Sequence, residues 1–123
     1  MDLRFAGAVL DVAVSDLDRA TAFFTVLLGG PPDLRPQDTQ WEWRLHGAPE
    51  VALRLTTDPQ SAGHSKLAIG VSDVVAERSR LLKHWSDLPQ ITQKPGVIAL
   101  LRFPDPDGNA VTLWQDLLGP RRS

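Results

Sequence analysis

The stretch Leu101-Arg-Phe-Pro-Asp-Pro-Asp-Gly-Asn-Ala-Val-Thr-Leu-Trp-Gln115 has the pattern of two strands joined by a tight turn. Its centre, 105–109, combines the residues that favour turns: proline presets φ, aspartate binds nearby backbone N–H groups, and glycine and asparagine tolerate positive φ. After the turn, valine and leucine alternate with Thr112 and Trp114, which is the period of a strand with two different faces. The stretch predicts a β-hairpin whose last strand turns one face to the core and leaves the other free.

A second pattern occurs twice in the chain. A strand that ends in Val-Ser-Asp and leads into helical periodicity is present at 10–16 and again at 67–73, a separation of 57 residues. Ser15-Asp16, at the end of the first copy, offers a helix N-cap. A repeat of this length indicates two copies of one module, near 5–58 and 64–117, within a single domain spanning 1–123.

Helices and further strands follow each copy of this pattern. The first helix is expected to end at Gly29-Gly30, and the second to run from about Val74 to Trp85. The segment through Pro89 and Pro95 is expected to be a loop. Additional strands are expected at 41–45, 51–56 and 97–103. Charged side chains of the second helix are expected to face solvent, namely Glu77, Arg78 and Arg80.

Composition excludes several classes of partner. The formal charge of −2 and the absence of a basic patch argue against nucleic acid as a ligand. No apolar run approaches the roughly 18 residues of a membrane span, and the N-terminus lacks the apolar region of a secretory signal. Without cysteine there is no disulfide, thiolate nucleophile or Cys-ligated metal. We expect a cytoplasmic protein with neither membrane nor nucleic-acid partners.

Three features together resemble one protein family: Val-Ser-Asp-Leu-Asp-Arg-Ala at 14–20, the helix through Phe23-Phe24 to Gly29, and Asp-Pro-Asp-Gly-Asn at 105–109. The family is the vicinal-oxygen-chelate superfamily, which includes glyoxalases, bleomycin-resistance proteins and extradiol dioxygenases, and the resemblance covers essentially the whole chain. It implies an α+β fold of two tandem βαβββ modules, whose curved mixed sheets surround a cavity and carry helices on the convex side. It also implies a homodimer, and leaves open whether modules pair within or between chains.

The same resemblance implies a divalent metal, bound in family enzymes by side chains on the first and last strands of each module. The matching positions in this sequence are Val9, Arg54, Lys66 and Thr112. Valine has no donor atom, arginine and lysine are cations, and one threonine hydroxyl is a weak ligand. We therefore expect no metal and no other cofactor. A displaced site that uses His64 and Asp11 is the alternative.

The cavity is then interpreted by its lining, and the strand 41–45 leaves two possibilities. Either Trp41, Trp43 and Leu45 face the cavity, or Glu42, Arg44 and His46 do. Tryptophan and cations would suit a flat aromatic or anionic small molecule. Equally, the tryptophans could anchor the core or a dimer interface, and the cations could pair with carboxylates across strands. The candidate ligand-binding residues are Asp11, Trp41, Trp43, Arg54, Lys66, Arg102, Thr112 and Trp114.

The leading functional hypothesis is a metal-independent binding protein that sequesters a small organic molecule, as the resemblance to bleomycin-resistance proteins implies. One alternative is a lyase, isomerase or dioxygenase-like enzyme, with a displaced metal or with Asp11 as a base beside Lys66. Another is a non-catalytic dimeric interaction domain, whose cavity is filled by its own side chains.

Overall fold

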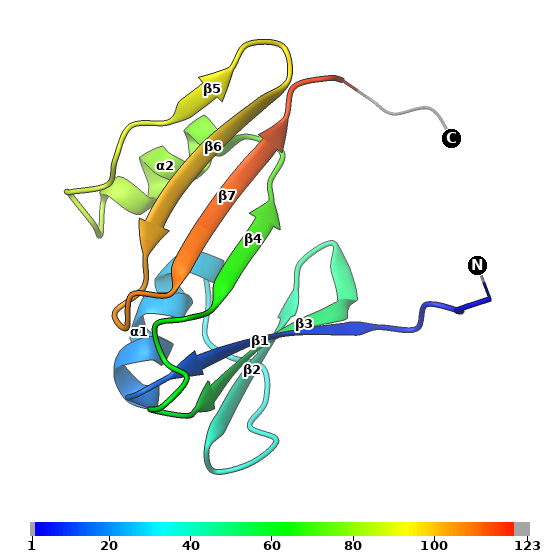
Figure 1. The fold of residues 1–123 in the computed structure, drawn as a ribbon, viewed down its shortest axis with the longest axis vertical. Helices are drawn as coiled ribbons and strands as arrows, with labels where there is room; N and C mark the ends of the chain where they lie inside the picture. Colours follow the sequence, from blue (N-terminus) through cyan, green and yellow to red (C-terminus); the bar gives the residue numbers. More distant parts are fainter. Residues whose placement is uncertain (1, 120–123) are drawn as a thin grey trace.

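The computed structural model describes residues 2–119 and contains two sheets and two helices (Figure 1). The first sheet has strand order β1-β3-β2, and the second has order β4-β7-β6-β5. The elements of the first half are β1 (Ala8–Val14), α1 (Leu17–Leu28), β2 (Gln40–Leu45) and β3 (Ala48–Thr57). Those of the second half are β4 (Lys66–Gly70), α2 (Val74–Leu82), β5 (Thr92–Lys94), β6 (Ile98–Pro104) and β7 (Ala110–Asp116). The predicted α+β fold with repeated βαβ order and open curved sheets is confirmed.

The two halves use the same pairing. Strand β1 is parallel to β3 as β4 is to β7, and each pair places its strand residues in equivalent register. The helices also begin alike, because Asp16 and Asp73 each accept a hydrogen bond from the backbone N–H three residues on, at 3.0 Å. These carboxylates satisfy amide groups that the first turn of a helix leaves without partners.

Strand β5 of the second half corresponds to a single β-bridge in the first half. Strand β5 lies at the edge of the second sheet, within the segment that the sequence predicts to be a loop, so this prediction is wrong. At the matching edge of the first sheet, Leu34 forms a single bridge to Glu42. Prolines at 31, 32 and 36 limit pairing there, because a proline has no N–H to donate to a strand.

A single hydrophobic core joins the two halves. Helix α2 packs on β6 and β7, and it lies behind them in Figure 1. Helix α1 packs on β2 and β3, yet its Phe23 ring also stacks on Trp85, with centroids 4.4 Å apart. The apolar residues of the alternating strands, such as Val14, Leu53 and Val111, are buried beneath the helices. The opposite strand faces are consequently left without a helical cover.

The 105–109 turn fastens the halves together. The side chain of Asn109, which is 1% exposed, accepts hydrogen bonds from the N–H groups of Gly63 and Ser65, both at 2.9 Å. Its Nδ2 donates to the carbonyl of Ala13 and to Asp105 Oδ2, both at 2.8 Å. Every hydrogen-bonding position of this amide is thus used. The turn links the end of β1 to the segment before β4.

The charged face predicted for the second helix is not simply solvated. Arg80 donates from Nη1 and Nη2 to the carbonyls of Val26 and Leu27, both at 2.7 Å, at the end of α1. Arg78 donates to the carbonyl of Pro89 at 2.8 Å. Carbonyls in the last turn of a helix lack intrahelical partners, so a guanidinium is a suitable donor there. Both arginines are partly exposed and also bind backbone carbonyls, so this face of α2 is more than a solvated surface.

No helix in residues 2–119 has the length and apolar character that crossing a membrane requires.

Candidate functional site

The face of the first sheet that carries no helix holds a row of charged side chains. The register places Asp11 of β1, Arg54 of β3 and Glu42 of β2 side by side across the strands. Arg54 donates from Nε and Nη2 to Glu42 Oε1 at 3.1 and 3.0 Å. The Glu42 residue is only 3% exposed, and this guanidinium is the partner that compensates its carboxylate for the loss of hydration. Arg54 is accordingly neutralised within the sheet.

Asp11 and the neighbouring Arg44 make the other polar contacts of this face. Asp11 accepts a hydrogen bond from the Thr56 hydroxyl at 2.8 Å and is exposed. Arg44 approaches Glu42 Oε2 at 3.5 Å as a second, outer cation. The cross-strand pairing that the sequence offered as an alternative is thus found for Arg54 with Glu42. Asp11 and Arg54, two predicted ligand-binding residues, lie on the same open face.

Trp41 and Trp43 do not face this surface, which corrects their assignment to the cavity lining. Trp43 is 3% exposed, its ring lies 6.3 Å from that of Phe24, and its Nε1 donates to the Gly30 carbonyl at 2.9 Å. Trp41 packs on the same core, with the Arg35 guanidinium 5.2 Å from its ring centroid. Both indoles lie on the core side of β2, so Glu42 and Arg44 lie on the opposite face of the strand.

The open face of the second sheet contains a cavity of about 350 Å³. Ala68, Thr112 and Arg102 form one row across β4, β7 and β6. Lys66 lies two residues before Ala68 on the same face of β4. Within residues 2–119, neither Lys66 nor Arg102 forms an ion pair or a side-chain hydrogen bond with another residue. The lining residues are Lys66, Leu67, Ala68, Arg102, Ala110 and Thr112, and none is acidic.

Trp114 adds an aromatic surface to the same face of β7, two residues beyond Thr112. Its partner on β4 is Gly70, and a Cβ placed there would lie 2.7 Å from the indole ring. Glycine is therefore required at this position for the ring to lie against the strand. The sequence predicts Trp114 and places Ala110 on the same strand face, but it does not single out the small residues Ala68 and Gly70 of β4. The alternation of Ala68 and Gly70 with Leu67 and Ile69 is the signal that could have revealed them.

The positions that correspond to metal ligands do not fit a divalent cation. Val9, Arg54, Lys66 and Thr112 provide no carboxylate, imidazole or thiolate, and Arg54 is itself a cation bound to Glu42. Within the part of the chain that the structure describes, no three His, Asp or Glu side chains come together. His64 with Asp11 therefore gains no third ligand of this kind.

The predicted residues fall into separate groups. Lys66, Arg102 and Thr112 line one cavity on the second sheet, and Trp114 lies outside its lining, on the same strand face as Thr112. Asp11 and Arg54 belong to the first sheet, whereas Trp41 and Trp43 are in the core. The arrangement on the second sheet offers two free positive charges, one hydroxyl and one indole face. It can hold an anion against an aromatic surface, and its lining has no acid-base pair.

No protein-family model matches the sequence, and no curated protein matches it. Solved structures are similar in fold. A glyoxalase/bleomycin resistance protein from Catenulispora acidiphila is 24% identical with a TM-score of 0.80, over 90% of this chain and 98% of that one. TnmS3, an antibiotic binding protein from Streptomyces sp. CB03234, is 25% identical with a TM-score of 0.74, over 94% and 98%. A lactoylglutathione lyase from Agrobacterium tumefaciens is 18% identical with a TM-score of 0.73, over 98% and 100%.

Proposed function

Because the chain has the fold of the vicinal-oxygen-chelate superfamily, we propose that it binds a small aromatic anion on the open face of its second sheet, independently of metal. One observation carries this proposal: the cavity of about 350 Å³ is lined by Lys66 and Arg102, whose charges no described residue neutralises, and by no carboxylate. Pockets of this size suit small organic ligands.

The chemistry of the lining defines the ligand class. A carboxylate or phosphate would accept charge-assisted hydrogen bonds from Arg102 and Lys66, which are roughly twice as strong as neutral ones. The Thr112 hydroxyl lies between them in the sheet and can donate as well. The indole of Trp114 would contact a flat ring on the same molecule. The proposed ligand therefore joins an aromatic ring to an acidic group.

Sequestration of such a compound is the biological role we propose. A similar structure, TnmS3, is an antibiotic binding protein. No metal enters the proposal, because Arg54 and Lys66 occupy matching positions with positive charge. A homodimer and a cytoplasmic location belong to the same proposal. Support for the dimer comes from the exposed apolar side chains of Leu3, Phe5 and Val9, which follow one another at the spacing of a strand face.

A fluorescence titration of the purified protein tests this function. The tryptophan emission is followed against 2-naphthoate, neutral 2-naphthol and cationic 2-naphthylmethylammonium, each with and without EDTA. The proposal expects saturable binding of the carboxylate, about tenfold tighter than of the neutral compound and unchanged by EDTA.

Two results would contradict the proposed function. Binding that needs a metal and is lost with EDTA would refute the metal-independent site. A turnover that survives EDTA and disappears in Asp11→Asn would instead identify an enzyme with Asp11 as its base.

A further inference from the structure

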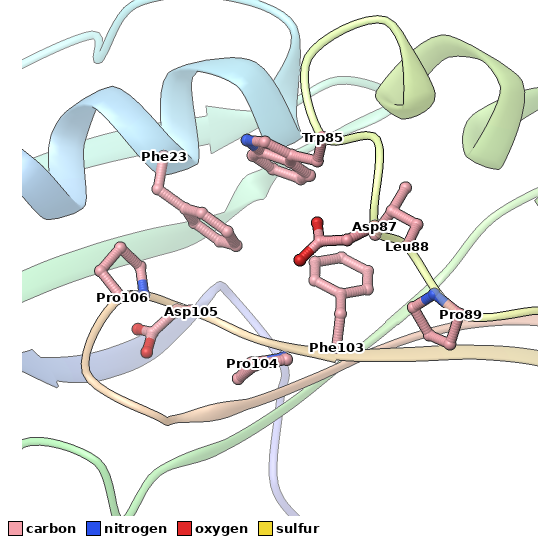
Figure 2. Close-up of a pocket in the computed structure, with 9 residues that line it drawn as sticks. All are labelled: Phe23, Trp85, Asp87, Leu88, Pro89, Phe103, Pro104, Asp105 and Pro106. Carbon is pink, nitrogen blue, oxygen red and sulfur yellow. The ribbon is translucent and has the colours of Figure 1, made fainter.

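A second pocket, of about 270 Å³, lies on the helix-covered side of the second sheet, away from the proposed anion site (Figure 2). It opens between α1, the segment that follows α2, and the start of the turn after β6. We call it the aromatic pocket. Its lining residues are Phe23, Trp85, Asp87, Leu88, Pro89, Phe103, Pro104, Asp105 and Pro106.

Three rings form the apolar wall of the aromatic pocket. Phe23 and Trp85 are stacked at 4.4 Å with an interplanar angle of 12°. Phe103 is tilted against both, at 6.2 Å from Phe23 and 5.8 Å from Trp85. The faces of aromatic rings carry negative electrostatic potential, so a wall of this kind attracts cations.

The polar groups of the aromatic pocket are almost all acceptors. Asp87 is exposed and has no ion pair or hydrogen bond with another residue in 2–119, and Figure 2 shows its carboxylate directed toward the rings. Three of the lining residues are prolines, which have no N–H, and the Trp85 indole is the only side-chain donor. No lysine, arginine or histidine lines the pocket. The lining is therefore complementary to a positive charge.

The two carboxylates of the pocket have different roles. Asp105 is buried, and its oxygens accept from the N–H groups of Asp107 and Asn109 and from the Asn109 amide. It is occupied by the turn and leaves Asp87 as the carboxylate that can meet a ligand. Arg78 holds the Asp87 segment in place through the carbonyls of Leu88 and Pro89, at 3.3 and 2.8 Å.

We infer that the aromatic pocket is a second binding site, for a compact hydrophobic ammonium ion whose charge meets Asp87 and whose apolar body contacts Phe23, Trp85 and Phe103. An apolar wall alone would accept any hydrophobic fragment. The free carboxylate and the lack of side-chain donors favour the cation over a neutral or anionic compound of equal size. This site shares no residue with the anion cavity, so each of the two binding proposals can be refuted without affecting the other.

Two-dimensional ¹H–¹⁵N NMR of the whole chain tests the inference. Four indole N–H signals are expected, and Trp85→Phe identifies that of Trp85. The probes are 2-phenylethylammonium, 2-phenylethanol and 3-phenylpropanoate. The ammonium ion should shift the Trp85 signal saturably and bind about tenfold tighter than the alcohol.

The variants make the assignment specific. Asp87→Asn should bring the ammonium ion to within about twofold of the alcohol without changing the alcohol's affinity, since only the charge is removed. Asp38→Asn, at another exposed carboxylate, should preserve the preference. Equal binding of all three probes, an ammonium-induced shift confined to Trp114, or a preference retained in Asp87→Asn would overturn the inference.

Discussion

Arg54 occupies a position where the family resemblance expects a metal ligand, and its guanidinium is bound instead to Glu42 through two hydrogen bonds. The carboxylate of Glu42 is almost fully buried while the guanidinium is partly exposed, at 4% and 28% of their side-chain surfaces. A carboxylate in such a place needs a positive partner, because the loss of its hydration is costly. The pair therefore serves the sheet rather than a ligand.

Removing the guanidinium alone should destabilise the protein. Arg54→Met leaves the Glu42 carboxylate with only the outer contact to Arg44, and we expect the free energy of unfolding to fall by about 1–3 kcal/mol. Denaturant unfolding followed by circular dichroism measures this loss. The double variant Arg54→Met/Glu42→Leu should recover most of it, since no buried charge remains. An unchanged midpoint in the single variant would show that the pair contributes nothing.

The orientation of the two tryptophans on β2 could not be predicted from the sequence. Strand β2 alternates tryptophan with charged residues. From this pattern alone, its tryptophan face could lie against the core or line a ligand site. The choice is made by Phe24 of α1 and by the Gly30 carbonyl, which surround Trp43 from a distant part of the chain. Only the packing of the helix determines it. By contrast, Thr112 and Trp114 could be placed together because they share one strand face.

At the scale of elements, the 105–109 turn is predicted by its own chemistry. The Asp105 carboxylate closes the turn locally by accepting from the backbone N–H and the side-chain amide of Asn109, as such side chains commonly do. The turn's bonds to Gly63, Ser65 and Ala13 come from segments far away in sequence, so no local pattern could announce them. The same is true of β5, a three-residue strand that exists through its pairing with β6.

Asn109→Ala should therefore cost more than the loss of a surface polar group. It removes four hydrogen bonds and leaves partly buried N–H and C=O groups without these partners, so we expect about 2–4 kcal/mol of destabilisation. Gln93→Ala, at an exposed site on β5, is the matched control and should change stability by less than about 0.5 kcal/mol. Urea unfolding compares the two variants, and equal midpoints would contradict the role of the turn.

At the scale of the whole molecule, the proposed homodimer has a direct test. Phe5 is 61% exposed on the segment before β1, and Val75 is 62% exposed on α2. If the N-terminal apolar residues form the interface, Phe5→Ser should shift the protein toward monomer in a sedimentation-velocity concentration series. Val75→Ser should leave the association unchanged. A wild-type protein that remains monomeric throughout the series would refute the dimer.

The overall architecture is the part that sequence predicts best. The 57-residue repeat and the two aspartate N-caps fix the order of elements, which the structure reproduces. The binding site is harder to predict from sequence, because its charge depends on which side chains remain unpaired after folding. Arg54 and Lys66 look equivalent in sequence, yet only Arg54 finds an internal carboxylate. Because the charge of Lys66 remains available, we place the proposed anion site on the second sheet.

Calorimetric titration with 2-naphthoate in EDTA determines whether Lys66 and Arg102 hold an aromatic anion. The double variant Lys66→Gln/Arg102→Gln removes both charges from the cavity, whereas Lys83→Gln/Lys94→Gln removes the same charge from exposed sites elsewhere. We predict that the first variant weakens binding by at least about tenfold and that the second preserves it. Equal affinity of the two variants for 2-naphthoate, or no binding by the wild type, would contradict the account.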